Sequence, residues 1–453
     1  MTDSLYAAKP WVALLNEAQR GPVRPDDSLV HALRRVVGET PDSTFLTYFD
    51  GRLSYREVDA LSDSVAGYLA ARGLEQGDRV AVLLQNSPHF VIALLGAWKA
   101  GAIVVPVNPM YKSGEVTHVL RDGEVAALIC TDRAWESYLR ETAVGSPVRI
   151  VLTACELDFQ TRDDARVLTF ERLPQAADAE DLVAVAKTGH KAPEGRQLAP
   201  EDIALISYTS GTSGAPKGAT NTHANILYNA ERQRTGLGLP DAPVYFAMAP
   251  LFHITGMVCQ LGASLVSGGS LVLVYRFEGG VVLDAFAEHR PHYTVGPSTA
   301  FMALAAHPAV TPDHFASFRN ISSGGAPVPP ALVEKFRAGF GPYIRNGYGL
   351  TECTAPAPPY RPTWRRPSTR RPGHSPWACR GPTPSYGSST TRARRCPSGS
   401  RARSSCAGRR SCPGTGGAPR PPPRPSRTGN CAPATSGSWT RRAGCTSSTA
   451  RRT

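Results

Sequence analysis

The chain has 453 residues, with 50 lysines and arginines against 37 aspartates and glutamates, a formal net charge of +13. The charge is uneven, because residues 354–453 hold 20 of the arginines and contain no Leu, Ile, Val, Phe, Met, Asp, Glu or Lys. Without them, residues 1–353 contain 30 basic and 37 acidic residues, a net charge of about −7. The charge of residues 1–353 therefore gives no support to a nucleic-acid-binding function.

The cysteine content and the apolar runs are used to predict the cellular compartment. Only Cys130, Cys155 and Cys259 precede residue 353, as in an ordinary reduced intracellular protein. The chain does not open with a charged region followed by an apolar segment, and its longest apolar run, 90–107, is interrupted by Lys99. We therefore expect a cytoplasmic protein without a transmembrane span.

From about residue 53 to residue 352, short β-branched runs alternate with helical patterns. This alternation predicts an α/β domain with parallel sheets layered with helices on both faces, and ligands at the carboxyl ends of the strands. The polar segment 180–200 is either a linker between two sub-sheets or a surface loop. The expected strands are 78–85, 103–107, 125–131, 148–154, 202–209, 244–250, 270–274, 293–297 and 319–325, and helices include 88–101 and 330–340.

The stretch YTSGTSGAPKG (208–218) joins an expected strand to a helix expected to begin near His223. Its glycines allow backbone N–H groups to turn toward one point, and its hydroxyls and lysine add donors and positive charge, as in a polyphosphate site. The spacing G-x-x-x-x-G-K-[ST] is absent, since Gly218 follows the lysine. A Gly/Ser/Thr cluster can also be a flexible turn. The proposed phosphate-binding residues are Thr209, Ser210, Gly211, Thr212, Ser213, Gly214 and Lys217.

This loop resembles the phosphate loop of the AMP-forming adenylating enzymes, the superfamily of acyl-CoA synthetases, luciferases and peptide-synthetase adenylation domains. Further segments match in the family's order, so the resemblance covers about residues 44–352. They are the structural motif LLGAWKAGAIVVPVNPMY (94–111), the acyl-pocket motif APLFHITG (249–256), the adenine loop SSGGAP (322–327) and the nucleotide and magnesium motif NGYGLTE (346–352).

The resemblance implies activation of a carboxylic acid by ATP and Mg2+, followed by transfer of the acyl group to CoA. Attack of a carboxylate on the α-phosphorus accumulates negative charge, so positioning and charge neutralisation dominate catalysis. The implied catalytic residues are Thr209, Lys217, Thr351 and Glu352, with Glu352, expected at the end of a strand, as the magnesium ligand. Tyr348 would offer its ring to adenine. The nucleotide-binding residues also include Gly324, Gly325, Ala326, Pro327, Asn346, Gly347, Tyr348, Gly349 and Thr351.

The substrate class is inferred from the segment around His253. No acidic residue lies between Pro250 and Val258, a region that usually leads to an ammonium-binding Asp in amino-acid-activating relatives. The pocket is therefore expected to take an uncharged acyl or aryl group. An isolated histidine is more often structural, so its role as a pocket gate rests on the resemblance. The expected lining is His253, Gly256, Met257, Gly296 with the residues up to Ala300, and Met302.

The family pattern stops after Glu352. A β-rich barrel, a ribose-binding Asp, a hinge Arg and a small mobile domain with a catalytic Lys are implied by the resemblance, but residues 354–453 contain no Asp or Lys. Their composition is that of a GC-rich gene read out of frame. Read from the third base of each codon, GNCAPATSGSWT (429–440) can spell ELRTGDVGVMD, and residues 442–453 can spell GWLYVVDRKKD, in family order. We therefore expect a frame break between residues 357 and 359.

Two segments follow from this interpretation. Residues 1–357 form an incomplete AMP-binding domain without the barrel and the small domain, and residues 358–453 form a disordered tail that cannot bury enough apolar surface to fold. Ligase activity is then lost or impaired. The alternatives are a genuine Arg-rich tail that binds nucleic acid or an anionic surface, a domain that loads a carrier protein instead of CoA, and an inactive nucleotide-binding fragment. The expected partners are the acid, ATP and CoA, without nucleic acid.

Overall fold

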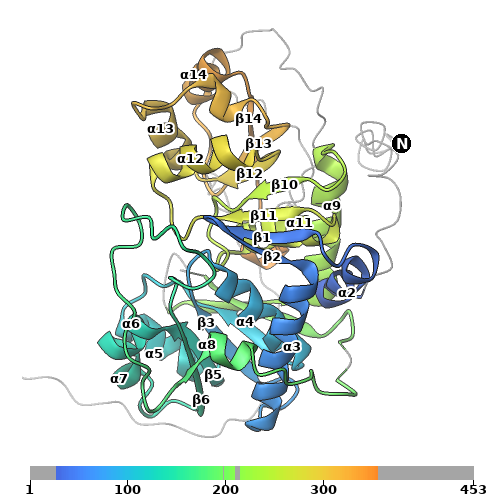
Figure 1. Ribbon diagram of the computed structural model, residues 1–453, viewed down its shortest axis with the longest axis vertical. Coiled ribbons are helices and arrows are strands. Elements are labelled where there is room, and N and C mark those ends of the chain that lie inside the picture. Colours follow the sequence, from blue (N-terminus) through green and yellow to red (C-terminus); the bar gives the residue numbers. More distant parts are fainter. Residues whose placement is uncertain (1–26, 197, 210–214, 356–453) are drawn as a thin grey trace, which may run out of the picture. The chain divides into compact units, whose positions relative to one another are not determined.

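The computed structural model describes residues 27–196, 198–209 and 215–355 (Figure 1). They belong to the first of the two units into which the chain divides, Met1–Ser385 and Tyr386–Thr453. The predicted tail, 358–453, lies outside the described residues. Two seven-stranded sheets with helices packed on them make up the described part, which confirms the predicted α/β class.

The first sheet has the strand order β14-β13-β12-β10-β11-β1-β2. Every neighbouring pair is parallel except β1 and β2, so the prediction of parallel sheets holds for all but one edge strand. The strands are β1 (Thr44–Tyr48), β2 (Gly51–Ser54), β10 (Val244–Phe246), β11 (Ser270–Leu273), β12 (Tyr293–Gly296), β13 (Asn320–Ser323) and β14 (Ile344–Asn346).

The second sheet has the strand order β7-β6-β5-β3-β4-β8-β9, again parallel except for one edge pair, β8 and β9. The segment 180–200 contains β7 and the short helix that follows it. Because β7 and the next strand, β8, both belong to this sheet, the segment does not link the two sheets. The strands are β3 (Arg79–Leu83), β4 (Ile103–Pro106), β5 (Val125–Thr131), β6 (Ile150–Ala154), β7 (Glu180–Asp181), β8 (Ile203–Thr209) and β9 (Lys217–Thr222).

Helices connect most of the parallel strands. Among the contacts, α3 packs on α4 and α8, and α9 packs on α11. The α-helices are α2 (Leu29–Glu39), α3 (Tyr55–Ala71), α4 (Pro88–Lys99), α5 (Ser113–Asp122), α6 (Asp132–Ala134), α7 (Arg140–Thr142), α8 (Leu182–Ala186), α9 (His223–Leu237), α10 (Ile254–Gly256), α11 (Ala263–Val266), α12 (Gly279–His289), α13 (Ser298–Ala306) and α14 (Pro330–Phe340). The π-helices are η2 (Trp135–Leu139) and η3 (Met257–Gly262), and the 3-10 helices are η4 (Pro312–Phe315) and η5 (Thr351–Cys353).

Strand β3 illustrates why its sequence is apolar throughout. Successive side chains of a strand point to opposite faces of the sheet. Val80 and Val82 belong to the main hydrophobic core, which extends across both sheets, whereas Ala81 and Leu83 belong to a smaller core on the opposite face. Both faces are therefore buried, as expected for parallel strands covered by helices.

Helix α4 has every residue buried, including Lys99. The Lys99 Nζ lies 2.6 Å from Asp59 Oδ1 and 2.7 Å from Asp63 Oδ1, so two carboxylates neutralise the buried ammonium group. In the described part of the chain, no helix combines the length and the apolar character needed to span a bilayer.

Asn86 joins the two sheets directly after β3. Its Nδ2 donates to the carbonyl oxygens of Ala247 (2.8 Å) and Ala249 (3.2 Å), and its Oδ1 accepts from Leu251 N (2.7 Å). Its backbone also exchanges two hydrogen bonds with Tyr275, each 3.1 Å long. Only 6% of Asn86 is exposed, so these are buried bonds. They fix the loop that follows β10 to the edge of the second sheet.

Asn86→Ala should lower the free energy of unfolding by about 3 kcal/mol, because three buried backbone groups lose their partners. Urea denaturation of the full chain measures the change. Asn108→Ala is the matched control, since the Asn108 side chain accepts one exposed bond from Met110 N. An equal effect of the two substitutions would contradict the importance of the buried joint.

Candidate functional site

The predicted phosphate loop is the connection of a β-hairpin. Strand β8 pairs with β9 up to Thr209 and Lys217, whereas the sequence predicted a direct passage from the loop into a helix. The Thr209 hydroxyl donates to the Lys217 carbonyl oxygen at 3.5 Å. Helix α9 does begin at His223, after this additional strand. The remaining loop residues, Ser210, Gly211, Thr212, Ser213 and Gly214, lie outside the described residues.

Helix α5 contacts the hairpin on both sides of the loop, at the end of β8 and at Pro216 just before β9. The Tyr208 hydroxyl donates to Asp122 Oδ2 at 2.6 Å, and His118 Nε2 lies 2.9 Å from the carbonyl oxygen of Pro216. Burial and the adjacent Asp122 carboxylate raise the pKa of Tyr208 well above its usual value, so its hydroxyl stays protonated. Sequence reasoning did not select His118 and Asp122, although their spacing of four residues places them on one helix face.

Gly218 allows the hairpin strands to pack closely. A Cβ atom at this position would lie 2.5 Å from Ile206 Cγ2 of β8, closer than carbon atoms can approach. The glycine after Lys217 is therefore required by side-chain packing, separately from any contact with a ligand.

Four neighbouring strands of the first sheet end at the predicted motifs. Because β10, β12, β13 and β14 are parallel, their carboxyl ends lie at one edge of the sheet. The loops that follow them carry the acyl-pocket motif, the residues from Gly296 onward, the adenine loop and the NGYGLTE motif, respectively. The structure thus gathers four sequence motifs that are separated by up to about a hundred residues.

The adenine loop and the segment after β14 lie against each other. Gly347 N donates to the Ser323 carbonyl oxygen at 2.7 Å, and a Cβ on Gly324 would meet the Gly347 carbonyl oxygen at 3.4 Å. Gly325 adopts a left-handed conformation with φ of 82°, which favours glycine. Tyr348 is 74% exposed, so one face of its ring is available to a flat ligand. Ala326, Pro327 and Gly349 are exposed as well.

Buried polar atoms accumulate where β13 and β14 end. The hydroxyls of Ser322 and Ser323 and the Asn346 Oδ1 have no hydrogen-bond partner among the described residues. Buried polar groups normally have a hydrogen-bond partner. These unpaired atoms therefore indicate a place for a ligand, water or a further segment.

The acyl-pocket motif forms the turn into α10. His253 caps this helix, its Nδ1 accepting from Thr255 N at 3.2 Å, so it has the structural role that an isolated histidine suggests. Desolvation lowers the pKa of His253 below the usual value of a histidine, which favours the neutral ring. A Cβ on Gly256 would lie 2.2 Å from the Pro250 carbonyl oxygen.

The predicted pocket lining divides into buried and exposed residues. Met257 is fully buried, and Gly296 lies under Met248, whose sulfur would be 2.5 Å from a Cβ at that glycine. Met302 is 44% exposed. Gln260, which the sequence did not single out, is buried and donates to the carbonyl oxygens of Phe246 (2.8 Å) and Val295 (2.9 Å). It links β10 to β12. A glutamine within the apolar run MVCQLG was the sequence feature that could have identified this buried polar residue.

Thr351 and Glu352 lie in the 3-10 helix η5, so the expectation that Glu352 ends a strand was wrong. Strand β14 ends at Asn346, before the Gly-Tyr-Gly segment that leads to η5. The Thr351 carbonyl oxygen accepts from Asn221 Nδ2 of β9 at 3.1 Å, which brings this turn to the phosphate-loop hairpin. Neither Lys217 nor Glu352 forms an ion pair within the described ranges, and both are exposed.

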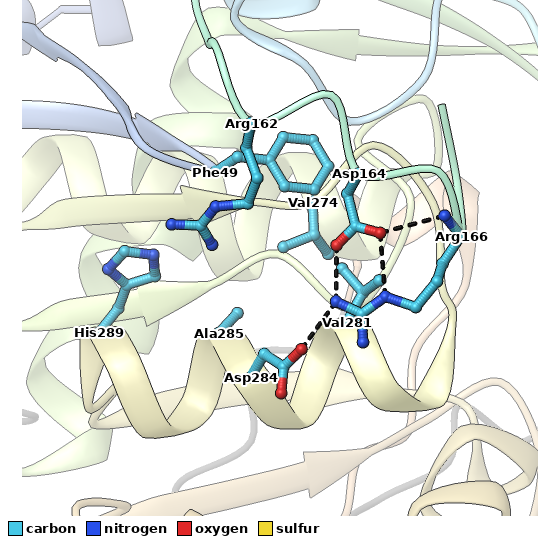
Figure 2. A pocket seen from close by; sticks show the side chains of 9 residues that line it. All are labelled: Phe49, Arg162, Asp164, Arg166, Val274, Val281, Asp284, Ala285 and His289. Carbon is cyan, nitrogen blue, oxygen red and sulfur yellow. Dashed lines mark hydrogen bonds and ion pairs between the residues drawn. The ribbon is translucent and has the colours of Figure 1, made fainter. Parts of the chain in front are cut away.

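Two cavities lie elsewhere, and no predicted site residue lines either. Figure 2 shows the smaller, about 10 Å³, which has room for about one water molecule. Three of its charged side chains pair with one another, since Arg166 donates to Asp164 (2.6 Å) and to Asp284 of α12 (2.7 Å). The larger, about 190 Å³, lies at the carboxyl ends of β5 and β6. Its lining is Asp132, Thr153, Ala154, Cys155, Arg172, Leu173, Gln175 and Asp181.

The arrangement provides donors, one cation and one carboxylate around an open edge. Over the described residues, no three His, Cys, Asp or Glu side chains are grouped as a metal site. A single carboxylate suits Mg2+ when substrate phosphates and water supply the other ligands, and Glu352 is exposed for that role.

The chain is similar in sequence to several known proteins. A family described as AMP-binding enzyme matches residues 33–381. The chain is 28% identical over 374 residues to a long-chain-fatty-acid–CoA ligase of Bacillus subtilis (strain 168), covering 77% of this chain and 64% of that protein. It is 32% identical over 316 residues to a feruloyl-CoA synthase of an Amycolatopsis species, covering 69% and 57%.

The fold is also that of solved ligase structures. The crystal structure of an anthranilate CoA ligase in complex with anthranoyl-AMP superposes with a TM-score of 0.65, at 24% identity, over 75% of this chain and 63% of that one. The chain thus spans less than two thirds of the length of these three proteins: 64%, 57% and 63%, respectively.

Gly218→Ala should lower the free energy of unfolding by about 2 kcal/mol, because the added methyl group overlaps the Ile206 side chain. Ile206→Ala in the same chain should recover part of that loss, since it removes the overlapping atom. Chemical denaturation of both single variants and the double variant gives the coupling. Gly114→Ala is the control, as a Cβ there meets no atom within 4 Å. Additive losses would refute the packing explanation.

Proposed function

Because the chain belongs to the AMP-binding enzyme family, we propose that its site binds ATP and activates a carboxylic acid as an acyl-adenylate, which then passes to CoA. The observation that carries this proposal is the convergence of four family motifs at the carboxyl edge of the first sheet. The hydrogen bond between Asn221 and Thr351 adds the phosphate-loop hairpin to that edge.

In the first step, an oxygen of the substrate carboxylate attacks the α-phosphorus of ATP. The new bond joins that oxygen to phosphorus, and the bond to the bridging oxygen breaks, so pyrophosphate leaves. Thr209 ends β8 before the loop, and the exposed Lys217 begins β9 after it. Their hydroxyl and ammonium groups would bind or neutralise phosphate oxygens. Thr351 would donate to the α-phosphate. In the second step, the CoA thiol attacks the acyl carbon, a thioester forms and AMP leaves.

Glu352 would hold Mg2+ together with phosphate oxygens and water. The bound cation would supply charge neutralisation to the phosphates. The adenine would lie between the exposed Tyr348 ring and the Gly324, Gly325, Ala326 and Pro327 backbone. Gly324 and Gly347 would permit close approach because they have no side chain.

An uncharged acyl or aryl acid is the proposed substrate. The absence of acidic residues from 250 to 258 gives an ammonium group no partner in that motif. The names of the relatives, a long-chain-fatty-acid–CoA ligase and a feruloyl-CoA synthase, cover both aliphatic and aromatic acids. His253, Gly256, Met257 and Gly296 would contribute to the acyl pocket. Loading assays with CoA and with a phosphopantetheinylated carrier protein separate the two possible acceptors.

For the chain as written, we propose impaired turnover. Residues 354–453 contain no Lys or Asp to serve as the catalytic lysine or the ribose-binding aspartate that the family resemblance implies. A frame break between residues 357 and 359 accounts for their composition. The DNA sequence across codons 354–360 tests the break directly, and a single open frame without family motifs in the alternative frame would contradict it.

Lys217→Ala should weaken ATP-Mg2+ binding by about tenfold or more, because a charge-assisted phosphate contact is lost, while the exposed side chain contributes little to folding. Titration calorimetry measures the dissociation constant, and denaturation checks the fold. Lys187→Ala, at an exposed lysine at the end of α8, should change neither quantity. ATP affinity equal to that of the unmodified chain in a folded Lys217→Ala variant would count against the assignment.

A one-base-corrected version should release pyrophosphate in an acid-dependent reaction at least about a hundredfold faster than the 453-residue chain, since losing even one electrostatic contact in a transition state typically costs that much. Acyl-CoA formation is followed in the same samples. Equal turnover by the two proteins would show that the present C-terminal segment supports catalysis.

A further inference from the structure

The turn that carries Thr351 and Glu352 is backbone-strained. Thr354 and Ala355 have φ of 60° and 66°, two successive left-handed residues that are not glycine. Such conformations are costly for side chains with a Cβ and persist only where the surroundings impose them. Within the turn, the N–H groups of Cys353 and Ala355 donate to the Leu350 carbonyl oxygen at 3.1 and 3.2 Å. These internal bonds close the turn but do not attach it to the rest of the molecule.

Asn221 attaches the turn to the phosphate-loop hairpin. Its Nδ2 donates to the Thr351 carbonyl oxygen at 3.1 Å and to the Thr354 hydroxyl oxygen at 2.8 Å, so both amide hydrogens are used. Asn221 is 1% exposed and Thr354 is 3% exposed. Asn221 and Lys217 are four residues apart on regularly paired β9, hence on the same face, about 13 Å apart along the strand.

Asn229 attaches the other end of the turn to helix α9. Its Nδ2 donates to the Cys353 carbonyl oxygen at 3.1 Å and to the Thr354 carbonyl oxygen at 3.0 Å. Together, the two asparagines provide four hydrogen bonds from one hairpin strand and its following helix. Three carbonyl oxygens of the turn, those of residues 351, 353 and 354, are thereby fixed on both sides of Glu352.

We propose that Asn221 and Asn229 are positioning residues that hold the Glu352 turn at a set place relative to Lys217, so that a magnesium–triphosphate ligand meets its carboxylate and its cation together. This inference rests on the proposed nucleotide function. Neither asparagine needs to touch the ligand. Their amides act by stabilising the strained residues Thr354 and Ala355, which directly follow the short 3-10 helix η5.

The test uses the full chain with Asn221→Leu, which keeps the side-chain size, and with Asn229→Ala. Asn225→Ala is the matched control. Asn225 lies on α9 with Asn229, but among the described residues its side chain bonds to Thr222 and not to the turn. Hydrogen exchange should show at least tenfold faster exchange of the amides of residues 353–355 in the first two variants only. The dissociation constant of ATP should rise about five- to tenfold in Mg2+, the loss expected for one or two hydrogen bonds, and stay within twofold in EDTA.

Unchanged exchange in residues 353–355 together with normal ATP binding would refute the asparagine assignment and leave the proposed function intact. Faster exchange with equal losses of affinity in Mg2+ and in EDTA would overturn the positioning role, because it would show a structural role without coupling to the metal. An unmodified chain that binds no ATP in either buffer would refute the proposed function, and the positioning role with it, even if exchange responds as expected.

Discussion

Parallel pairing of β10, β12, β13 and β14 is the constraint on which the site depends. Parallel strands need a crossover between them, and each crossover leaves from the same edge of the sheet. The four loops at that edge can therefore vary in sequence without changing their common location. Glycines allow these loops to pack closely. A Cβ atom added at Gly324 would lie 3.4 Å from the Gly347 carbonyl oxygen, and one added at Gly296 would overlap the Met248 sulfur.

The second sheet contributes through buried polar contacts at its border with the first. Asn86 bonds the loop after β10, and the Tyr48 hydroxyl donates to the Glu156 carbonyl oxygen at 3.0 Å. The Glu156 carboxylate is buried and lies 2.7 Å from Arg133 Nη2. Desolvation raises the pKa of Glu156, and the arginine opposes that shift. Directional bonds of this kind fix one relative placement of the sheets, which apolar packing alone specifies less strictly.

Charge is distributed differently inside and at the edge. In the interior, Lys99 is neutralised by two aspartates, and Glu156 is paired with Arg133. At the edge, Lys217 and Glu352 are exposed, and neither forms an ion pair in the described part of the chain. Solvated charges of opposite sign cost little to keep apart, so they are available to a polyanion and its cation. The strain at Thr354 and Ala355 falls in the same place, as strain often does at functional sites.

The sequence by itself determined the alternation of strands and helices, because period and β-branching are local properties. Strand β5 and helix α14 have the predicted bounds, and the ordered motifs led to the family. It did not determine β9, whose residues KGATNT carry little apolar character and form a strand only because β8 offers an open edge. Nor did it place Glu352 correctly, or select Asn86, His118, Gln260 and Asn221. A polar side chain acquires its partner from segments remote in sequence, so only the tertiary structure decided which of these residues hold the site together.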